Sequence, residues 1–204
     1  MVKRLIEIKR IKGKDAARTC ARWHYSGTVP GASAPYGIWE DGKYIGCIVF
    51  GYGASCNLGK GYGFDPNECC ELVRIALSGE QKEHTTKYVA AVIKVFKAMN
   101  KNINCIFSFS DLEQNHIGTL YQAGNWLYLG VANGNKYAFF TADGTRVHSR
   151  TIRANCITYS GKKTIRKRIK DKHRYAYPLS RSARKKLKAF TKPYPSKRGG
   201  NGAT

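Results

Sequence analysis

Two side chains suited to acid–base chemistry, Asp111 and Tyr121, flank a short stretch that should be a helix. The apolar segment INCIFSFSD precedes it, and the helix should end at Gly124, before the aromatic segment NWLYLG. A carboxylate can orient an amine and stabilise the positive charge that develops on it. A phenol can return a proton to a departing group. Each residue has a structural alternative, since Asp111 could simply cap the helix and Tyr121 could be an ordinary amphipathic-helix residue.

Three other residues could take part in the same chemistry. Arg74 lies within the apolar stretch ELVRIAL. A guanidinium fixed in a cleft can bind a phosphate or carboxylate through two parallel hydrogen bonds, although an Arg in a strand more often points to solvent. His24 and Tyr25 follow a predicted helix, where they could handle a proton or bind a metal, or could be ordinary surface residues.

The elements that must position these side chains follow from the spacing of apolar residues. Period-two alternation predicts strands, and spacings of three and four predict helices. The clearest helix is HTTKYVAAVIKVFKAMN, with Thr85 or Thr86 as its cap. In chain order we predict a strand at 2–11, a helix at 14–27, a hairpin at 34–53 turning at Asp41 and Gly42, a strand at 69–79, a helix at 84–100, a strand at 103–111, a helix at 114–124, and strands at 125–132 and 136–144.

This order predicts an α+β fold with a mixed sheet between helices. A chain of 204 residues with 42% hydrophobic residues can form one sizeable domain. The pattern weakens from about residue 145. We therefore expect a folded domain at 1–145 and an extension at 146–204 that contains one helix, at 179–190.

The extension is strongly basic. Residues 146–204 hold 19 Lys and Arg against the single acid Asp171, and so carry +18 of the formal charge of +23. Such asymmetry indicates a polyanionic partner, nucleic acid ahead of membrane, unless the charge only keeps the protein soluble. Cations interleaved with aromatic residues suit phosphate contacts with little sequence readout. The predicted contacts are Lys162, Lys163, Arg166, Lys167, Arg168, Lys172, Arg174, Arg184, Lys185 and Lys186.

Several other classes of protein are not expected. No apolar run approaches the roughly 20 residues of a membrane-spanning helix, and the start MVKRLIEIKR does not resemble a signal peptide. We therefore expect a soluble, intracellular protein. Seven irregularly spaced Cys without a CxxC pair indicate neither a disulfide scaffold nor a zinc knuckle.

A glycine-rich loop, NLGKGYGFDPNE, and its flanks carry three aromatic residues, Tyr52, Tyr62 and Phe64. An enzyme that acts on a base within a duplex must take the base out of the stack, and aromatic rings can recover part of the cost. These rings could serve that purpose, or they could pack beneath the loop.

The segment around Tyr121 resembles a pattern of the acetyltransferase-like GNAT family. It stands here as Asn115, Gly118, Leu120, Tyr121, Gly124 and Trp126. The resemblance implies a mixed, mostly antiparallel central sheet flanked by helices. It also implies that Tyr121 lies near the sulfur of an acyl donor, where it would protonate the departing thiolate.

A wider resemblance, over nearly the whole chain, is to the phage Mom family. It is carried by HYSGTVP (24–30), ELVRIALSGEQ (71–81), TTKYVAAVIK (85–94), FSFSD, HIGTLYQAGNWLYLG, KHRYAYPL and KPYP. Members of this family add a carbamoylmethyl group to the exocyclic amine of adenine in phage DNA. The resemblance implies this activity, with double-stranded DNA and a small-molecule donor as partners, protection from host restriction, and a location in the cytoplasm of the infected bacterium.

The resemblance also implies roles for the residues singled out above. Asp111 would hold the adenine amine, Tyr121 would serve the leaving group, and Arg74 would clamp the donor or the substrate. His24 and Tyr25 would complete the cleft. Iron has been associated with the family, although the chain shows no 2-His-1-carboxylate spacing.

The donor site departs from the GNAT pattern. GNAT enzymes usually hold the coenzyme A pyrophosphate on a glycine-rich turn at the start of a helix, where backbone N–H groups meet phosphate. The corresponding turn here, SGEQKEHTTKYVAA, has one glycine. We expect acetyl-CoA or a related acyl or glycyl donor to be bound by Thr85, Thr86 and Lys87, together with Asn115.

Two alternative functions stay open. The chain could be a coenzyme A-dependent N-acetyltransferase of a small amine or a protein. It could also be a non-enzymatic protein that shields DNA from nucleases. Its oligomeric state, monomer or dimer, is open as well.

Overall fold

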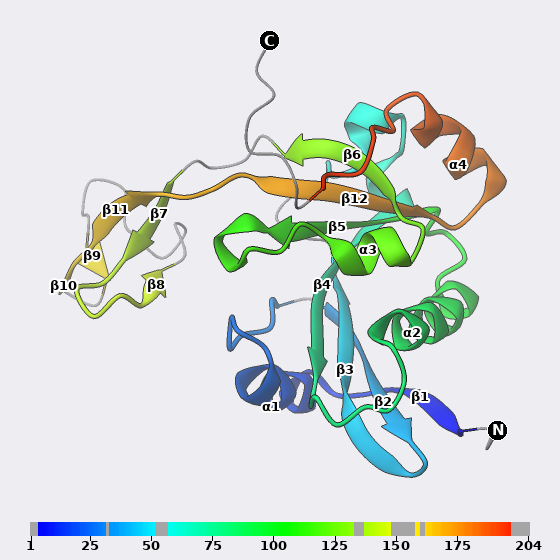
Figure 1. Ribbon diagram of the computed structural model, residues 1–204, viewed down its shortest axis with the longest axis horizontal. Helices are drawn as coiled ribbons and strands as arrows, with labels where there is room; N and C mark the ends of the chain where they lie inside the picture. Colours follow the sequence, from blue (N-terminus) through cyan, green and yellow to red (C-terminus); the bar gives the residue numbers. More distant parts are fainter. Residues whose placement is uncertain are drawn as a thin grey trace.

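The computed structural model describes residues 4–31, 33–51, 57–132, 137–147, 158–159 and 162–196. Within these residues, seven strands form the central sheet, in the order β1-β2-β3-β4-β5-β12-β6 (Figure 1). The strands are β1 (Ile6–Arg10), β2 (Ser33–Glu40), β3 (Lys43–Gly51), β4 (Cys69–Leu77), β5 (Cys105–Asp111), β6 (Leu127–Ala132) and β12 (Lys172–Pro178).

The chain order of elements up to β6 is the predicted one, and the sheet is mixed and mostly antiparallel, as expected for a GNAT-like fold. The β2–β3 hairpin turns at Asp41 and Gly42, whose φ angles of 50° and 81° are both positive. Two positive φ angles define the type I′ turn that matches the twist of a hairpin. The one parallel pairing among the described strands joins β4 and β5.

That parallel pairing is short. It spans only Cys69–Glu71 of β4 and Cys105–Phe107 of β5. Beyond it β4 pairs with β3 alone, and β5 pairs with β12. The two strands therefore separate, and their separation opens the sheet on the side where β5 ends (Figure 1).

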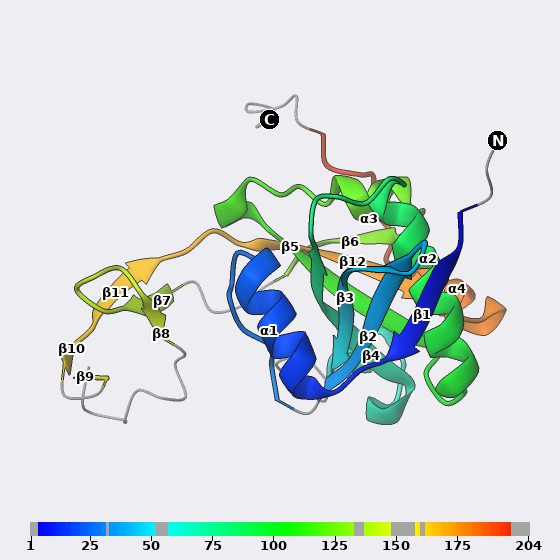
Figure 2. The same ribbon diagram turned by 90° about the horizontal axis from the view of Figure 1, so that it is seen from below.

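Helices cover both faces of the sheet. α1 (Gly13–Trp23) buries Ala16 and Cys20 against Cys47 and Val49 of β3. α2 (Thr85–Met99) packs against the opposite face (Figure 2). The apolar residues Val89, Val92, Ile93 and Phe96 of α2 are buried, as their spacing predicts. The helix is capped by His84, which has an extended backbone, and not by Thr85 or Thr86. Successive strand residues point to opposite faces of a sheet. Because helices cover both faces here, β3 is apolar at nearly every position.

The segment predicted as an extension contributes to the main sheet. β12 lies between β5 and β6 and buries Tyr175 and Ala176. The predicted helix at 179–190 is confirmed as α4 (Arg181–Lys188), which Ser180 caps by accepting a hydrogen bond from Ala183 N. The boundary expected near residue 145 therefore does not mark the end of the main sheet, because β12, which lies beyond that residue, is one of its strands. The predicted DNA-binding role of the segment stays a prediction.

A second, smaller sheet projects from the body. It consists of β7 (Tyr137–Phe140), β8 (Arg146–Val147) and β11 (Ile165–Arg168), in the order β11-β7-β8. We call residues 137–147 and 162–168 the arm; they include β10 (Lys162–Lys163), which pairs with β9 (Thr158–Tyr159). Figures 1 and 2 both show the arm at the end of the molecule opposite α4. The sequence predicted β7 but not β8 or β11.

Two further findings concern classes considered above. No helix among the described residues is long and apolar enough to cross a membrane. Five cysteines, Cys20, Cys47, Cys69, Cys70 and Cys105, are buried free thiols, while Cys56 and Cys156 lie outside the described residues. The five described cysteines thus pack as small apolar side chains, as expected.

Candidate active site

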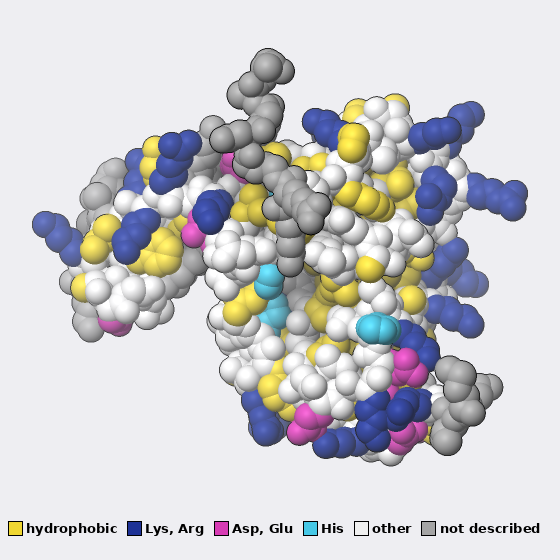
Figure 3. All heavy atoms as spheres, viewed as in Figure 1, with side chains coloured by type: hydrophobic (Ala, Val, Ile, Leu, Met, Phe, Trp, Pro, Cys, Tyr) yellow, Lys and Arg dark blue, Asp and Glu magenta, His cyan; other side chains and the backbone are white. Residues whose placement is uncertain are grey.

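A cavity of about 780 Å³ lies where β4 and β5 separate. Figure 3 shows a hollow at the centre of the molecule with histidine side chains at its edge. The end of α1, strands β4 and β5, the loop 115–119, α3 (Thr119–Ala123), the arm and the connection 169–171 all contribute to its wall. The five predicted catalytic residues all line it: His24, Tyr25, Arg74, Asp111 and Tyr121. The fold therefore brings together residues spread over about half of the chain.

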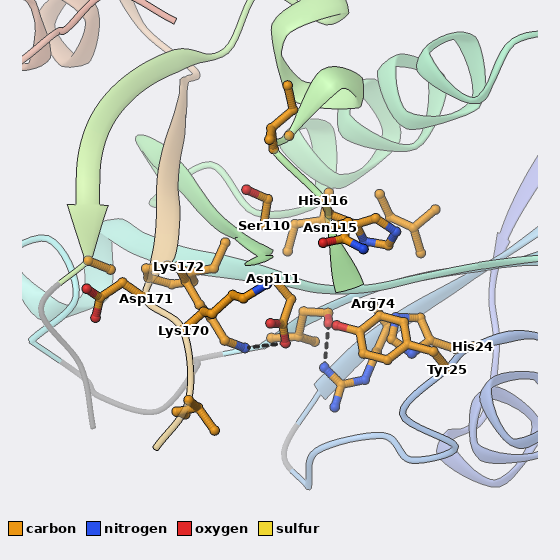
Figure 4. Close-up of a pocket in the computed structure, with 18 of the residues that line it drawn as sticks. His24, Tyr25, Arg74, Ser110, Asp111, Asn115, His116, Lys170, Asp171 and Lys172 are labelled. Atoms are coloured by element: carbon orange, nitrogen blue, oxygen red, sulfur yellow. Dashed lines mark hydrogen bonds and ion pairs between the residues drawn. The ribbon is translucent and has the colours of Figure 1, made fainter. Parts of the chain in front are cut away.

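Asp111 ends β5 and is only 5% exposed. Its Oδ1 accepts a hydrogen bond from Glu113 N at 3.1 Å. Asp111 therefore caps the short 3-10 turn Leu112–Gln114 and not the predicted helix, which begins only at Thr119. Its Oδ2 lies 3.1 Å from Lys172 Nζ (Figure 4). The carboxylate also faces the cavity. Asp111 is thus both a cap and a candidate site residue, and Lys172, predicted to contact DNA, belongs to the same site.

Tyr121 lies in α3 and points back into the sheet. Its hydroxyl is 2.7 Å from Ser108 Oγ, and Ser108 in turn donates to the carbonyl of Leu72 at 2.9 Å. Ser108 is the donor in both contacts, so its single proton is shared between the Leu72 carbonyl and the Tyr121 hydroxyl. Burial raises the pKa of Tyr121 to about 12, so the phenol stays protonated at neutral pH. Its ring packs against Trp126 and Tyr175.

Arg74 ties the loop after α1 to β4. Its Nε donates to the carbonyl of Thr28 at 2.8 Å, and its Nη1 donates to the carbonyl of Val73 at 2.6 Å. A guanidinium has five N–H donors, so these two bonds leave others that a ligand in the cavity could use. Arg74 is half-buried and lines the cavity, in contrast to the solvent-facing alternative.

His24 and Tyr25 form an aromatic wall. Their rings stack with centroids 4.4 Å apart, and His116 meets the Tyr25 ring edge-on at 6.1 Å (Figure 4). His24 Nδ1 accepts from the backbone N–H of Ser26 at 3.1 Å, so the ring proton resides on Nε2. Burial, and then the nearby charge of Arg74, lowers the pKa of His24 to about 4. The imidazole is therefore neutral at physiological pH.

The sequence analysis missed several polar residues of the cavity wall, among them Glu71 and Ser110. Glu71 lies on β4 at the point of separation, and burial raises the pKa of its carboxyl to about 7, a rise that Lys172 and Arg74 partly oppose. Ser110 Oγ is buried and has no hydrogen-bond partner among the described residues. An acid inside the mostly apolar strand CCELVRIAL, three residues before Arg74, was the available signal for Glu71.

The four residues predicted to bind the donor molecule do not lie together. Asn115 lines the cavity, with a left-handed φ of 54° that Asn tolerates. Thr85, Thr86 and Lys87 do not line it. Lys87 Nζ lies 2.8 Å from the Glu83 carboxylate, and the Glu40 carboxylate accepts a hydrogen bond from the backbone just before α2. Two carboxylates at this helix N-terminus oppose an anionic ligand, so these residues do not fit a coenzyme A pyrophosphate.

The described part of the chain brings no three His, Cys, Asp or Glu side chains together at metal-binding distances. The residues present therefore do not fit a resident iron ion.

The aromatic residues of the glycine-rich loop lie elsewhere. Phe64 is 3% exposed and belongs to a core cluster with Phe107, and Tyr62 packs against the Phe107 and Phe190 rings. Neither Tyr62 nor Phe64 lines the cavity. The packing alternative is correct for these two, because the loop folds over the far side of β5. Tyr52 lies outside the described residues.

The ten cations predicted to contact DNA fall into three groups. Lys172, Arg174 and Lys186 are engaged within the chain, Arg174 by donating to Tyr62 Oη and Lys186 by donating to the Gly63 carbonyl. Six have exposed side chains: Lys163, Arg166, Lys167 and Arg168 on the arm, and Arg184 and Lys185 on α4. Lys162 is described by its backbone alone, in β10. Figure 3 shows Lys and Arg side chains gathered at both ends of the molecule.

Two solved structures with which this chain shares a similar fold are acetyltransferases. One is a Bacillus subtilis acetyltransferase in complex with CoA, 15% identical, with 87% of this chain and 100% of that chain covered at a TM-score of 0.47. Another is the Campylobacter jejuni N-acetyltransferase PseH in complex with acetyl coenzyme A, 12% identical, with 86% and 100% covered at a TM-score of 0.45.

The particular family is shown by sequence. The model of the Mom protein family matches residues 5–196, and the chain belongs to that family. A curated relative is Methylcarbamoylase mom of Escherichia phage Mu. It is 24% identical over 174 residues, which cover 78% of this chain and 70% of the relative.

Proposed function

We propose that this protein is a DNA-modifying transferase that adds a carbamoylmethyl group to the N6 amine of adenine in double-stranded DNA. One observation carries the proposal: the five residues predicted from separate motifs line one cavity of about 780 Å³. Ligand pockets commonly span about 300 to 1,000 Å³, so a purine and a small donor fit together. Membership of the Mom family, and the printed name of the phage Mu relative, support the reaction.

The aromatic wall is where the base would stack. A base inside a duplex costs a few kcal/mol to extrude, and stacking on aromatic rings recovers about 1 to 3 kcal/mol. The His24–Tyr25 stack presents such a surface at the cavity, and His24 is neutral there. A neutral imidazole adds no positive charge to the wall on which the base would stack.

Two carboxyl groups could act on the amine. The lone pair of adenine N6 is delocalised into the ring, so the amine is a poor nucleophile. Asp111 would accept one amine N–H and stabilise the charge that grows on nitrogen. Glu71, with its pKa raised to about 7, would take the proton lost when N6 becomes bonded to carbon. An acid poised near neutral pH is well suited to that exchange.

The group transfer balances with these residues. The bond from N6 to the donor carbon forms while the bond from that carbon to the leaving group breaks, and the electron pair stays with the leaving group. The N6 proton passes to Glu71. Tyr121, held protonated by its raised pKa, would donate its proton to the leaving group if that group is basic. Arg74 and Asn115 would hold polar groups of the donor. For this product the donor must carry its leaving group on the methylene carbon of a –CH2–CO–NH2 unit, because an acyl or glycyl donor would form an amide on N6 instead.

The setting of the reaction rests on the family. A phage enzyme of this kind would act on phage DNA in the cytoplasm of the infected bacterium. The modified adenine would protect that DNA from host restriction, because added bulk on N6 occupies the major-groove edge that proteins read.

Mass spectrometry of nucleosides tests the proposal. DNA from bacteria that express the protein should contain a deoxyadenosine heavier by one carbamoylmethyl group, and Asp111→Asn should abolish it. Lys97→Ala, an exposed change on α2, is the matched control and should leave the modification intact. If the wild-type protein folds and binds DNA but leaves adenine unmodified, the transferase assignment is wrong and DNA shielding takes its place. An acetylated amine or protein instead would identify an ordinary N-acetyltransferase.

A further inference from the structure

The arm carries paired cations and aromatic rings on one face. Arg166 is directly opposite Phe139, and Arg168 is opposite Tyr137, in the antiparallel β11–β7 pair. Opposite residues of such a pair project to the same face. The guanidinium of Arg166 lies 3.9 Å from the centroid of the Tyr137 ring. This face therefore presents two guanidinium groups, one of them seated on an aromatic ring.

The other face repeats the combination. Ile165 is opposite Phe140, and Lys167 Nζ lies 5.5 Å from the Phe140 ring. Ile165 is 51% exposed, and Tyr137 on the first face is 45% exposed. Each face of the arm therefore places a partly exposed large side chain beside cations.

The positively charged side chains of the arm are accessible to a ligand. Lys163, Arg166, Lys167 and Arg168 are exposed, and among the described residues none has a carboxylate within ion-pair distance. The arm contains six Lys and Arg and one acid, Asp143. The Asp143 carboxylate accepts a hydrogen bond from Thr145 N within its own turn. The arm is thus an almost purely cationic surface, which fits a polyanion.

The arm is also continuous with the cavity. Ala138, Phe139 and Val147 line the cavity, as does the connection 169–171 that leads from β11 into β12. The exposed cations predicted on α4 do not line it and lie at the opposite end of the molecule (Figures 1 and 2). A ligand held by the arm is therefore beside the candidate active site, whereas a ligand held by α4 is not.

We propose that the arm is the DNA-holding surface of this protein, binding the duplex that flanks the extruded base, and that α4 is dispensable for this binding. The inference rests on the proposed function for its choice of duplex DNA as the polyanion. Arg166, Lys167 and Arg168 contact phosphates on both sides of the strand. Tyr137 and Ile165 lie against the sugars or the open base step, as apolar wedges do in other proteins that distort a duplex.

Two matched double substitutions test the arm. Arg166→Ala with Arg168→Ala removes two charges from the arm, and Arg184→Ala with Lys185→Ala removes two from α4. Affinity for a short duplex is measured by fluorescence anisotropy over a range of salt concentrations. Each phosphate contact contributes about 0.9 to the slope of log affinity against log salt. The arm pair should bind more weakly and lower the slope by about 1.8, while the α4 pair should match the wild type.

The opposite pattern would overturn the inference. It fails if the α4 pair loses as much slope as the arm pair, or more, or if neither pair loses any. Circular dichroism checks that both variants are folded. Vesicles containing phosphatidylglycerol serve as a competitor, and the inference also fails if they displace the duplex at equal phosphate concentration.

The same assay separates this inference from the proposed function. Asp111→Asn lies in the cavity and not on the arm, so it should retain the wild-type salt slope although it is inactive. If the wild-type protein leaves DNA unmodified but the arm pair still loses slope, the transferase proposal fails and the arm assignment stands. If modification is found and the arm pair has the wild-type slope, only the arm assignment fails.

Discussion

Lys172 Nζ lies 3.1 Å from Asp111 Oδ2, and the two residues are direct partners in the β12–β5 pairing. The ion pair joins the end of one central strand to the start of another that comes 61 residues later in the chain. It holds one oxygen of the cavity carboxylate while a backbone N–H holds the other. Strand pairing itself therefore sets the orientation of Asp111.

Replacing Lys172 should impair the reaction more than DNA binding. Lys172→Ala removes a charged partner of Asp111, and hydrogen bonds to charged groups are worth about 1.5 to 3 kcal/mol. The turnover rate at saturating DNA should fall roughly tenfold or more, and Lys172→Arg should restore part of it. Rates come from nucleoside mass spectrometry. Lys188→Ala, on exposed α4, is the control. A variant with normal turnover but weakened DNA binding would show that Lys172 contacts phosphate and does not act through Asp111.

Glu71 should make both activity and stability depend on pH near neutrality. Its carboxyl pKa is raised to about 7, so the proposed base is active above that value and activity should rise as pH rises through 7. Stability should change in the opposite direction. Between the ordinary pKa near 4.5 and 7 the folded state binds more protons than the unfolded state, so the free energy of unfolding falls as pH rises.

The variant Glu71→Gln separates these effects. It should lose most activity and the pH step near 7. It should also have a higher melting temperature than the wild type at pH 8, with the difference shrinking toward pH 4, because the variant has no buried charge. Scanning calorimetry at several pH values provides the measurement. A lower melting temperature of Glu71→Gln at pH 8 would contradict the burial of an unpaired carboxylate.

His24 should remain neutral well into the acid range. Its pKa is lowered to about 4, and its Nδ1 accepts from Ser26 N. Between that value and the ordinary 6.5 the unfolded state binds more protons, so the His24 contribution to stability is lost as pH falls from about 6.5 to 4. Nitrogen NMR of the ring should show the Nε2–H tautomer at pH 6. A normal titration near 6.5 would mean that the ring is exposed and unsuited to the stacking wall.

The hydroxyl of Tyr121 should matter for chemistry and little for folding. Tyr121→Phe keeps the ring contacts with Trp126 and Tyr175 and removes only the bond to Ser108. Losing a general acid costs roughly 100-fold or more in rate, while one hydrogen bond contributes about 1 kcal/mol to stability. Tyr128→Phe loses a comparable bond, to His173, outside the cavity and should keep its activity. Equal rates for the two variants would exclude the acid role.

Gly118 should be intolerant of any side chain. Its φ is +85°, and an added Cβ would lie 2.3 Å from the Tyr175 ring. Gly144 has the same φ of +85° with no atom within 4 Å, so it reports the backbone cost alone. Gly144→Ala should lose about 1 to 2 kcal/mol of stability, and Gly118→Ala should lose a further 1 to 3 kcal/mol through the clash. Urea unfolding compares them. Equal losses would show that the Tyr175 ring can move aside.

Local pattern predicted most of the elements and much of the candidate site. The apolar spacing of α2, the Asp41–Gly42 turn and the carboxylate that ends β5 are all properties of neighbouring residues. For the same reason the HYS, ELVRIAL and HIGTLY motifs could be recognised one at a time. Small errors arose at their ends, such as the cap at His84 in place of Thr85 or Thr86.

The pairing of distant strands could not be read in this way. Nothing near Lys172 in the sequence shows that it begins a strand between β5 and β6, because that placement depends on contacts with residues far away in the chain. The charge run around it predicted DNA contacts for ten cations alike, without distinguishing among them. The structure separates those engaged within the chain from those exposed on the arm, and it adds Glu71 and Ser110 to the cavity.

The amino-acid sequence by itself determined the family, the order of helices and strands, the basic character of the second half and the residue types that could act on an amine. The tertiary structure alone decided that five of those residues share one cavity, that the chain beyond residue 145 completes the sheet, and which positive charges face outward. The physical reason is the distance along the chain over which each kind of interaction acts. Periodicity and turn chemistry act between neighbours, whereas burial and strand pairing are settled only when segments far apart in the chain come into contact.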